Sequence, residues 1–369
     1  MRTFPTIVKG FCMKLSSATF KWRLVCVVAL ATTMPVCAGV TNPDISVIGQ
    51  MRTFVTDDRA DSNRNRAQFS FDESEIQADA ALNPYAHGTF VFSLANGSAD
   101  VEEGYLQIVR GLPNGLAFKA GKYRVGFGRL NPLHPHAYPF VYRPRVLAEY
   151  LPGDESYNET GGQLSYRLPL PGSLSSTISG DVLQGNSFHP GQSGSRPAWL
   201  FRWANFFALK DPSSMEVGLS ATEGTNDVLR ATRTFICGAD AKAKVWTSPL
   251  NSLTLQGEFL ALDRQNALAH SATLTVNKTH IRPAGGYFTA DYFYHKRWEG
   301  GFIYERFQRA IPQKPWDQSA GLFVGFGPME ETTLFRLVWD RYFPQGGFAS
   351  NLYTLQIVWS MGPHKAHQF

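Results

Sequence analysis

The chain has 369 residues, of which 43% are hydrophobic and 13% aromatic, and its formal net charge is +5. Residues 1–38 hold five of the 35 basic residues and no acidic residue, so 30 basic and 30 acidic residues remain in 39–369. Because the basic excess lies wholly in the first segment, residues 39–369 have no overall positive charge. This balance argues against nucleic-acid binding, which needs a basic face on the folded domain.

Residues 1–38 have the features of a secretory signal peptide. Lys21 and Arg23 precede the apolar run 24–31, and Val36-Cys37-Ala38 ends the segment with small residues suited to cleavage. The apolar run is too short for a membrane helix. Translation from Met13 would give a complete signal as well, and Cys37 leaves a lipoprotein anchor as an alternative. Three of the four cysteines lie here, so Cys237 cannot form an intramolecular disulfide or a cysteine metal cluster.

The following residues, 39–369, repeat a period-two pattern that is typical of β-strands. In 352–361, for example, Tyr353, Leu355, Ile357 and Trp359 alternate with Thr354, Gln356 and Ser360. About sixteen such strands can be placed, and no stretch of about 20 apolar residues interrupts them. One face of each strand is suited to lipid and the other to water. The pattern therefore predicts an all-β, transmembrane antiparallel β-barrel over residues 39–369.

The predicted connections alternate in length, as they do in a barrel threaded up and down through one membrane. Tight turns are expected near 83–85, 111–115, 171–172, 210–212, 248–251, 295–296 and 327–329. Longer loops are expected near 57–67, 129–160, 185–197, 223–231, 264–282, 308–317 and 342–350, and one short join near 96–100 breaks the rhythm. A closed barrel satisfies every backbone amide in lipid, and sixteen strands leave an aqueous lumen. A secreted soluble β-protein remains the alternative.

The segment around the longest loop carries a family resemblance. Residues 119–140, KAGKYRVGFGRLNPLHPHAYPF, resemble a stretch of porin-like outer-membrane β-barrels related to the phosphate-selective porin O and P family, and the similarity is most specific over about 115–165. The resemblance implies a homotrimer of sixteen-stranded barrels in the bacterial outer membrane. It also implies that the loop after the fifth strand, 129–160, folds into each pore as a constriction. That family lines its path with many Lys and Arg, whereas this chain is neutral after its leader, so phosphate specificity does not follow.

Charge is nevertheless uneven along the chain. Residues 116–148 hold six basic residues and no acidic residue. Strand alternation predicts that Tyr123, Val125 and Phe127 face lipid, so that Lys122 and Arg124 point inward. Rings of Arg and Lys favour anions. We therefore expect a weak anion preference, set by pore residues Lys122, Arg124, Arg129, His134, His136, Tyr138, Arg143 and Arg145, opposite an acidic wall of Glu73, Glu75 and Glu102. In the alternative interpretation these charges pair with one another and hold the wall together, with Arg143 and Arg145 anchoring the loop.

His134 and His136 form an H-x-H pair in the proline-rich loop. Imidazoles commonly bind zinc or copper, but no sequence spacing identifies a third ligand, so the two residues are only weak candidates for a metal site. No catalytic motif and no cofactor motif is found. The sequence predicts a passive porin, not an enzyme, through which small hydrophilic or anionic solutes cross a lipid membrane. The alternative is a barrel with a specific ligand or metal-complex uptake role.

Overall fold

The computed structural model describes residues 43–362, apart from 96–97, 195, 211, 269–276 and 330–331. The predicted signal peptide, residues 1–38, lies outside the described residues. So does the side chain of Glu73, although its backbone is described. Among the described residues, none of the helices has the length and apolar composition needed to cross a membrane.

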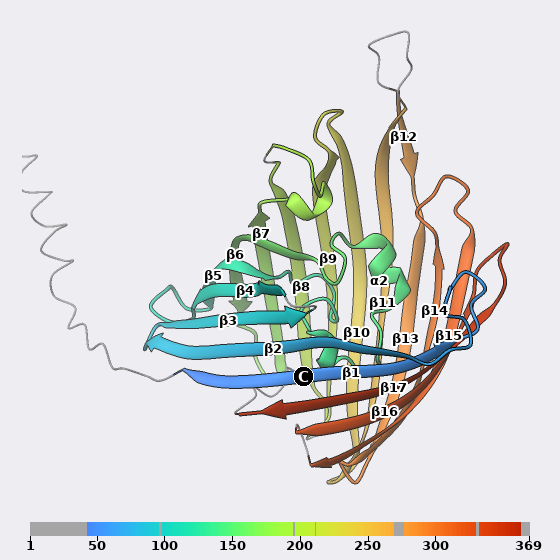
Figure 1. Cartoon of the computed structure of the whole chain (residues 1–369). Coiled ribbons are helices and arrows are strands. Elements are labelled where there is room, and N and C mark those ends of the chain that lie inside the picture. Colours follow the sequence, from blue (N-terminus) through green and yellow to red (C-terminus); the bar gives the residue numbers. More distant parts are fainter. Residues whose placement is uncertain are drawn as a thin grey trace, which may run out of the picture. The chain divides into compact units, whose positions relative to one another are not determined.

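The described residues form one antiparallel sheet of seventeen strands (Figure 1). The strands are β1 (Asp44–Thr56), β2 (Gln68–Asn83), β3 (Ala86–Ala95), β4 (Ser98–Ile108), β5 (Leu116–Arg124), β6 (Asn158–Leu168), β7 (Leu174–Leu183), β8 (Ala198–Ala208), β9 (Ser214–Asp227), β10 (Thr232–Ser248), β11 (Asn251–Leu268), β12 (Asn277–Ile281), β13 (Ala284–Tyr294), β14 (Trp298–Gln308), β15 (Trp316–Met329), β16 (Thr333–Phe343) and β17 (Ser350–Met361). Three short helices, η1 (Pro135–Ala137), α2 (Arg145–Tyr150) and η2 (Asn186–Phe188), lie in the connections.

The sheet closes on itself because β1 pairs with both β2 and β17. Strands β12 and β13 both pair with β11, opposite Arg264 and Ala261 respectively, so they occupy one position in the barrel. The interruption falls at Arg282-Pro283, and proline has no N–H to donate to the ladder. The seventeen strands therefore make a closed antiparallel barrel of sixteen positions, which confirms the predicted fold.

The two faces of each strand differ as the period-two pattern predicted. On β16, Leu337 is 58% exposed on the outside, whereas Arg336 is 3% exposed on the inside. On β17, Tyr353 and Met361 lie outside, and Thr354 and Gln356 are buried. The outer face is thus apolar and the inner face polar, the arrangement expected of a barrel that stands in lipid.

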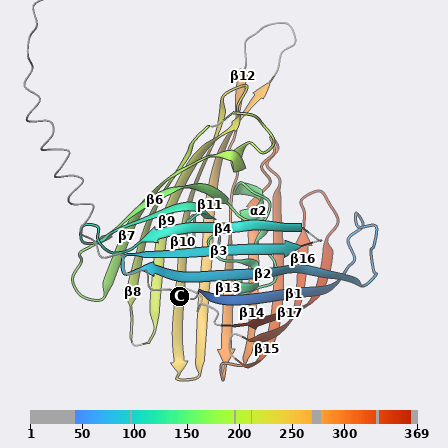
Figure 2. The same cartoon turned by 60° about the vertical axis from the view of Figure 1, so that its left-hand side comes forward.

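The two ends of the barrel also differ. Tight turns make every connection at one end, here called the turn end (Figure 2). The long connections lie at the other, the loop end, where, among the described strands, only the joins β3–β4 and β9–β10 are short. Two predicted loops were wrong in extent. β9 and β10 pair as far as Asp227 and Thr232, so only 228–231 connect them, and β11 continues through Leu268 in place of a loop from 264. Turn-forming residues in 223–231 and 264–268 suggested earlier strand ends than the ladder gives.

The connection between β5 and β6, residues 125–157, folds into the barrel and is here called the constriction loop. Its apolar residues, among them Val125, Leu130 and Leu147, form one buried cluster with Leu200 of β8 and Phe323 of β15. Helix α2 contacts β11, β13 and β14, and Figures 1 and 2 both show it enclosed by strands. The predicted inward-folding loop after the fifth strand is confirmed. It begins at Val125 instead of 129, because the β5–β6 ladder ends at the pair of Arg124 and Asn158; a last hydrogen bond joins the Val125 N–H to Tyr157 O.

Candidate pore constriction

A buried asparagine holds the two ends of the constriction loop together. Asn131 is 1% exposed, and its Nδ2 donates to the carbonyls of Val125 and Tyr157 over 2.8 and 2.9 Å. Its Oδ1 accepts the Tyr157 N–H at 2.8 Å. One side chain thus satisfies backbone groups at both ends, so the loop starts from a fixed geometry.

The first turn of the loop is docked on Glu258 of β11. The N–H groups of Arg129 and Leu130 donate to Glu258 Oε1 over 3.1 and 2.7 Å. Gly128 has a φ of +63°, which an L side chain rarely adopts, and a Cβ there would overlap the Glu258 carboxylate. Glycine is therefore required at this position for the backbone to approach the wall.

Helix α2 is fixed to the wall at β14 and β16, and the residues before it contact β17. Arg145 pairs with Asp340 of β16 and lies 3.4 Å from Glu305 of β14. The pKa of Arg145 is raised, since burial, which lowers it, is outweighed by the hydrogen bond and charge of Asp340. Tyr142 Oη shares a hydrogen bond with Thr354 Oγ1 of β17 at 2.8 Å. For Arg145, the geometry favours the anchoring interpretation.

Other predicted basic residues are paired as well. Arg124 is 4% exposed, donates to Glu102 Oε2 at 2.8 Å, and also contacts the Leu133 carbonyl. Arg129 lies 3.2 Å from Glu216. Arg143 donates to the carbonyls of Gly153 and Asp154 within its own loop. The charges of Arg124 and Arg129 are thus matched by carboxylates on the wall.

The predicted direction of β5 was wrong. Tyr123 is 1% exposed and donates its hydroxyl to Asp181 of β7 at 2.9 Å, so it does not face lipid. Val125 and Phe127 are also buried, in the apolar cluster of the loop. Arg124 is nevertheless inside, because the strand ends at this residue and the alternation ends with it. Sequence periodicity was extended here past the point where the chain leaves the sheet.

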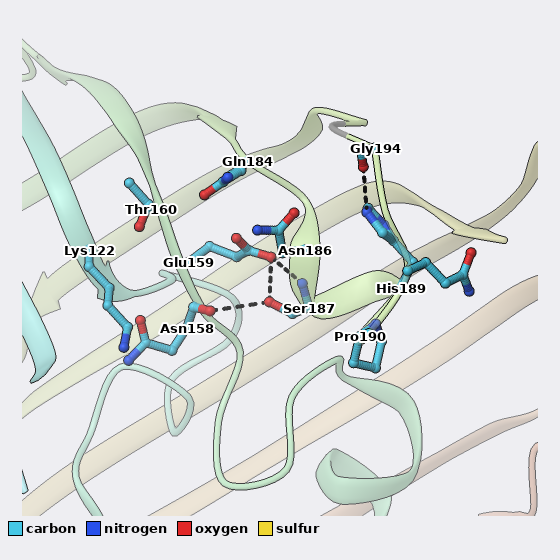
Figure 3. Close-up of a pocket in the computed structure, with 12 residues that line it drawn as sticks. Lys122, Asn158, Glu159, Thr160, Gln184, Asn186, Ser187, His189, Pro190 and Gly194 are labelled. Carbon is cyan, nitrogen blue, oxygen red and sulfur yellow. Dashed lines mark hydrogen bonds between the residues drawn. The ribbon is translucent and has the colours of Figure 1, made fainter. Parts of the chain in front are cut away.

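Lys122 lies apart from the other predicted pore residues. Its Nζ is 3.8 Å from Asp100 Oδ2, and it lines a polar cavity of about 650 Å³ beside η2 (Figure 3). In this cavity Ser187 donates its hydroxyl to the Asn158 carbonyl and its N–H to Glu159, and His189 contacts the Gly194 carbonyl. These groups satisfy one another between β6 and the η2 connection. We therefore interpret this cavity as a structural feature of the loop end.

The acidic wall and the histidine pair come together. His134 Nδ1 lies 3.0 Å from Glu75 Oε2 and 3.2 Å from Glu102 Oε2, and its Nε2 lies 2.8 Å from Glu103 Oε1. His136 Nδ1 is 3.4 Å from Glu75. Burial and Arg124 act to lower the pKa of His134, but the three carboxylates outweigh them and hold it well above its ordinary value. The sequence indicated Glu75, Glu102 and both histidines, but not Glu103.

A cavity of about 530 Å³ lies below the loop, toward the turn end. Tyr138 and His136 of the loop line it. The wall supplies five basic and two acidic residues, namely Lys242, Lys244, Lys296, Arg297, Arg336, Asp291 and Glu299. Sequence reasoning missed these lysines, although Asp240, Lys242 and Lys244 share one face of a period-two strand. The alternation of charged residues along this strand could have identified Lys242 and Lys244 from the sequence alone.

Comparison with known proteins gives one relative in sequence and several in structure. No protein-family model matches the chain. The chain is 29% identical over 259 residues to an uncharacterized protein of Aquifex aeolicus (strain VF5), a match that covers 64% of this chain and 54% of that protein. This chain therefore spans about half the length of that relative. The resemblance to the phosphate-selective porin O and P family stays a prediction.

The similar solved structures are outer-membrane proteins. The outer membrane channel DcaP of Acinetobacter baumannii has a TM-score of 0.56 and 10% identity, over 87% of this chain and 98% of that one. An anion-selective porin from Comamonas acidovorans also scores 0.56 at 10% identity, over 86% and 99%. The trimer form of OmpT from Vibrio cholerae scores 0.54 at 12% identity, over 87% and 100%. At such identities the likeness concerns the fold alone: the chain has the fold of outer-membrane porins.

Proposed function

We propose that this chain is a passive porin of the bacterial outer membrane, through which small hydrophilic solutes diffuse. The supporting observation is the closed sixteen-position barrel with a polar inner face, an apolar outer face and one long loop folded inside it. A barrel of this size encloses more space than its own side chains fill. The constriction loop occupies part of that space, so solutes pass between the loop and the remaining wall. No catalytic step and no cofactor is needed for this role.

We further propose a weak anion preference, with a different origin from the one predicted. Arg124, Arg129 and Arg145 pair with carboxylates, so these three residues add little net charge to the aperture. The lining of the cavity at the turn end, by contrast, holds five basic and two acidic residues, so its formal charge is positive. Unbalanced charge in a low-dielectric cleft raises the local concentration of counter-ions. We therefore place the selectivity at Lys242 and Lys244.

The experiment is a reversal-potential measurement in planar lipid bilayers across a KCl gradient. The wild type should conduct with a chloride preference, and a double variant, Lys242→Gln with Lys244→Gln, should shift the reversal potential toward the cation side. Lys278→Gln is the matched control, because Lys278 lies on β12 at the loop end and donates to the Ala231 carbonyl. An equal shift in the control, or none in the double variant, would reject this placement. A silent membrane would reject the porin itself.

Homotrimer formation in outer-membrane lipid belongs to the same proposal. It is supported by the exposed apolar side chains of the outer face, such as Val182, Leu219 and Val324, and by the trimer form of the structurally similar OmpT. Cross-linking of the detergent-solubilised protein should give a three-chain species. A single-chain species at all cross-linker concentrations would contradict the trimer and leave the porin proposal intact.

A second candidate function, a barrel with a role in the uptake of a specific ligand or metal complex, is favoured by one observation. His134 and His136 lie against three carboxylates at the edge of the turn-end cavity. Competition between zinc and chloride flux in the same bilayer assay separates the two candidates. A metal-selective channel would carry zinc at the expense of other ions, whereas a general porin would not.

A further inference from the structure

Five side chains able to ligate a metal meet where the constriction loop touches β2 and β4. Glu75 comes from β2, Glu102 and Glu103 come from β4, and His134 and His136 come from the loop. One donor atom each from Glu75, Glu102 and His134 lie within 4.8 Å of one another. Ligands from three separate segments therefore converge on one point inside the barrel.

Glu75 has an unusual environment for a buried carboxylate. It is 1% exposed, and neither of its carboxylate oxygens accepts a hydrogen bond. A carboxylate removed from water is costly unless it is hydrogen-bonded, paired with a cation or bound to a metal. The nearest groups are the Nδ1 atoms of His134 and His136, at 3.0 and 3.4 Å from its Oε2. The Glu75 carboxylate is thus directed at two imidazoles without hydrogen-bond geometry to either.

The orientation of His134 is that of a metal ligand. Its Nε2 lies 2.8 Å from Glu103 Oε1, so Nε2–H donates to that carboxylate. Nδ1 faces Glu75 and Glu102 and makes no hydrogen bond of its own. Without metal, a proton on Nδ1 offsets the charge of these two carboxylates; a metal ion that displaces this proton would take its place and be bound by the Nδ1 lone pair. A carboxylate on the far nitrogen is the usual device that orients a metal-ligating histidine.

Distance and charge agree with a small divalent ion. Zinc bonds of about 2.0–2.2 Å in a tetrahedral site place two donor atoms about 3.3–3.6 Å apart. The two His134–carboxylate distances, 3.0 and 3.2 Å, are slightly shorter than this separation. Three carboxylates and the guanidinium of Arg124, which is 2.8 Å from Glu102, leave two negative charges around neutral imidazoles. A divalent ion would neutralise the cluster.

We infer that Glu75, Glu102 and His134 bind a divalent first-row transition-metal ion such as Zn²⁺. Mixed imidazole and carboxylate donors suit zinc, iron or manganese better than calcium. His136 lies 3.4 Å from Glu75 and lines the turn-end cavity, which provides a route for the ion. Glu103 is a positioning residue that acts through the His134 ring. The bound ion would tie the constriction loop to β2 and β4.

The test is calorimetric titration of the full chain, refolded in detergent and stripped with EDTA, with ZnCl₂ at pH 7. We expect one ion per chain with a Kd in the micromolar range or tighter. Glu75→Gln and His134→Gln should each weaken binding by at least tenfold. The matched control is His280→Gln, since His280 lies 2.6 Å from Asp263 on the loop-end strands, outside the cluster. Absence of binding in the wild type, or equal affinity in Glu75→Gln and His280→Gln, would overturn the inference.

A spectroscopic measurement on the wild type keeps the inference testable if a variant fails to fold. Co²⁺ bound by imidazole and carboxylate at low coordination number should give visible bands distinct from those of the hydrated ion. Glu103→Gln should shift these bands and weaken binding by about 10- to 100-fold, as loss of an orienting partner does. A spectrum identical to hydrated Co²⁺ would overturn the site. Neither measurement involves conduction, so failure here is distinct from failure of the proposed porin function.

Discussion

At the scale of single residues, the constriction loop depends on a few buried polar groups that each satisfy several backbone partners. Asn131 holds both ends of the loop, and Glu258 receives the first turn. Neither role could be predicted from the sequence. Asn131 lies in a Pro-rich stretch whose composition is typical of a turn, and Glu258 is 127 positions after it. Hydrogen bonds between such distant residues are set by the closed barrel, not by local pattern.

Replacing the loop's asparagine tests the clamp. Asn131→Ala removes two donors and one acceptor that serve buried backbone groups, each worth about 1–3 kcal/mol when left unsatisfied. We expect a lower thermal unfolding temperature and faster proteolysis within 125–157, while the barrel itself stays folded. Limited proteolysis followed by mass spectrometry locates the cut. A cleavage pattern equal to that of the wild type would contradict the clamp.

Gly128→Ala tests the close approach to Glu258 by a different route. A methyl group at this left-handed position overlaps the carboxylate and strains the backbone as well. We expect destabilisation of about 1–3 kcal/mol, measured by chemical unfolding. Gly172→Ala is the matched control, since Gly172 also has positive φ but lies in a turn where an added Cβ meets no atom within 4 Å. Similar losses in the two variants would mean that backbone strain alone explains the effect.

The pKa of His134 gives a stability that depends on pH. Because this pKa is raised in the folded state, the contribution is full below the unfolded value near 6.5 and is lost as the pH rises through the folded pKa. In EDTA, the unfolding temperature should therefore fall as the pH is raised from about 6 into the alkaline range. The charged groups that face His134 are the carboxylates of Glu75, Glu102 and Glu103 and the guanidinium of Arg124. A His134→Gln profile as steep as that of the wild type would contradict this assignment.

At the scale of elements, helix α2 is the part of the loop that is anchored by charge. Arg145→Met would leave Asp340 and Glu305 buried without their partner, at a cost of about 3–5 kcal/mol. We expect the loop to separate from β14 and β16, which should appear as larger and noisier single-channel currents. Arg143→Met is the control, because Arg143 contacts carbonyls of its own loop. Quiet, unchanged currents in Arg145→Met would argue against the anchor.

Strands and their order were predictable from the sequence, whereas the path of the loop was not. Period two and turn composition identify β16 and β17 directly, since lipid and water impose different residues on the two faces. The same rule failed at Tyr123, Val125 and Phe127, because these residues leave the sheet and are buried by the loop that follows. It also did not locate Glu103, whose carboxylate is placed by a register shift between β3 and β4. Irregularities of the strand ladder cannot be predicted from the period-two pattern of the sequence, because they interrupt that pattern.

At the scale of the whole molecule, the closure of the barrel and the filling of its interior have separate causes. Closure follows from the need to pair every backbone amide in lipid, and it fixes sixteen positions with β1 between β2 and β17. Filling depends on one loop, whose apolar cluster packs against the wall from β8 to β15. The residual space toward the turn end is lined by more basic than acidic side chains. The predicted basic residues Arg124, Arg129 and Arg145 are paired with carboxylates, and the closed fold brings the lysines of β10 together with Lys296 and Arg297 at the turn end.

If the constriction loop narrows a water-filled barrel, the loop should limit the conductance of the pore. Single-channel recording measures this directly, with the wild type compared with a variant in which residues 132–155 are replaced by a short Gly-Ser linker. We predict steady ion conduction by the wild type and a severalfold larger conductance in the variant. No conduction by the wild type would mean that the barrel is not an open pore, and equal conductance in both proteins would mean that the loop does not narrow it.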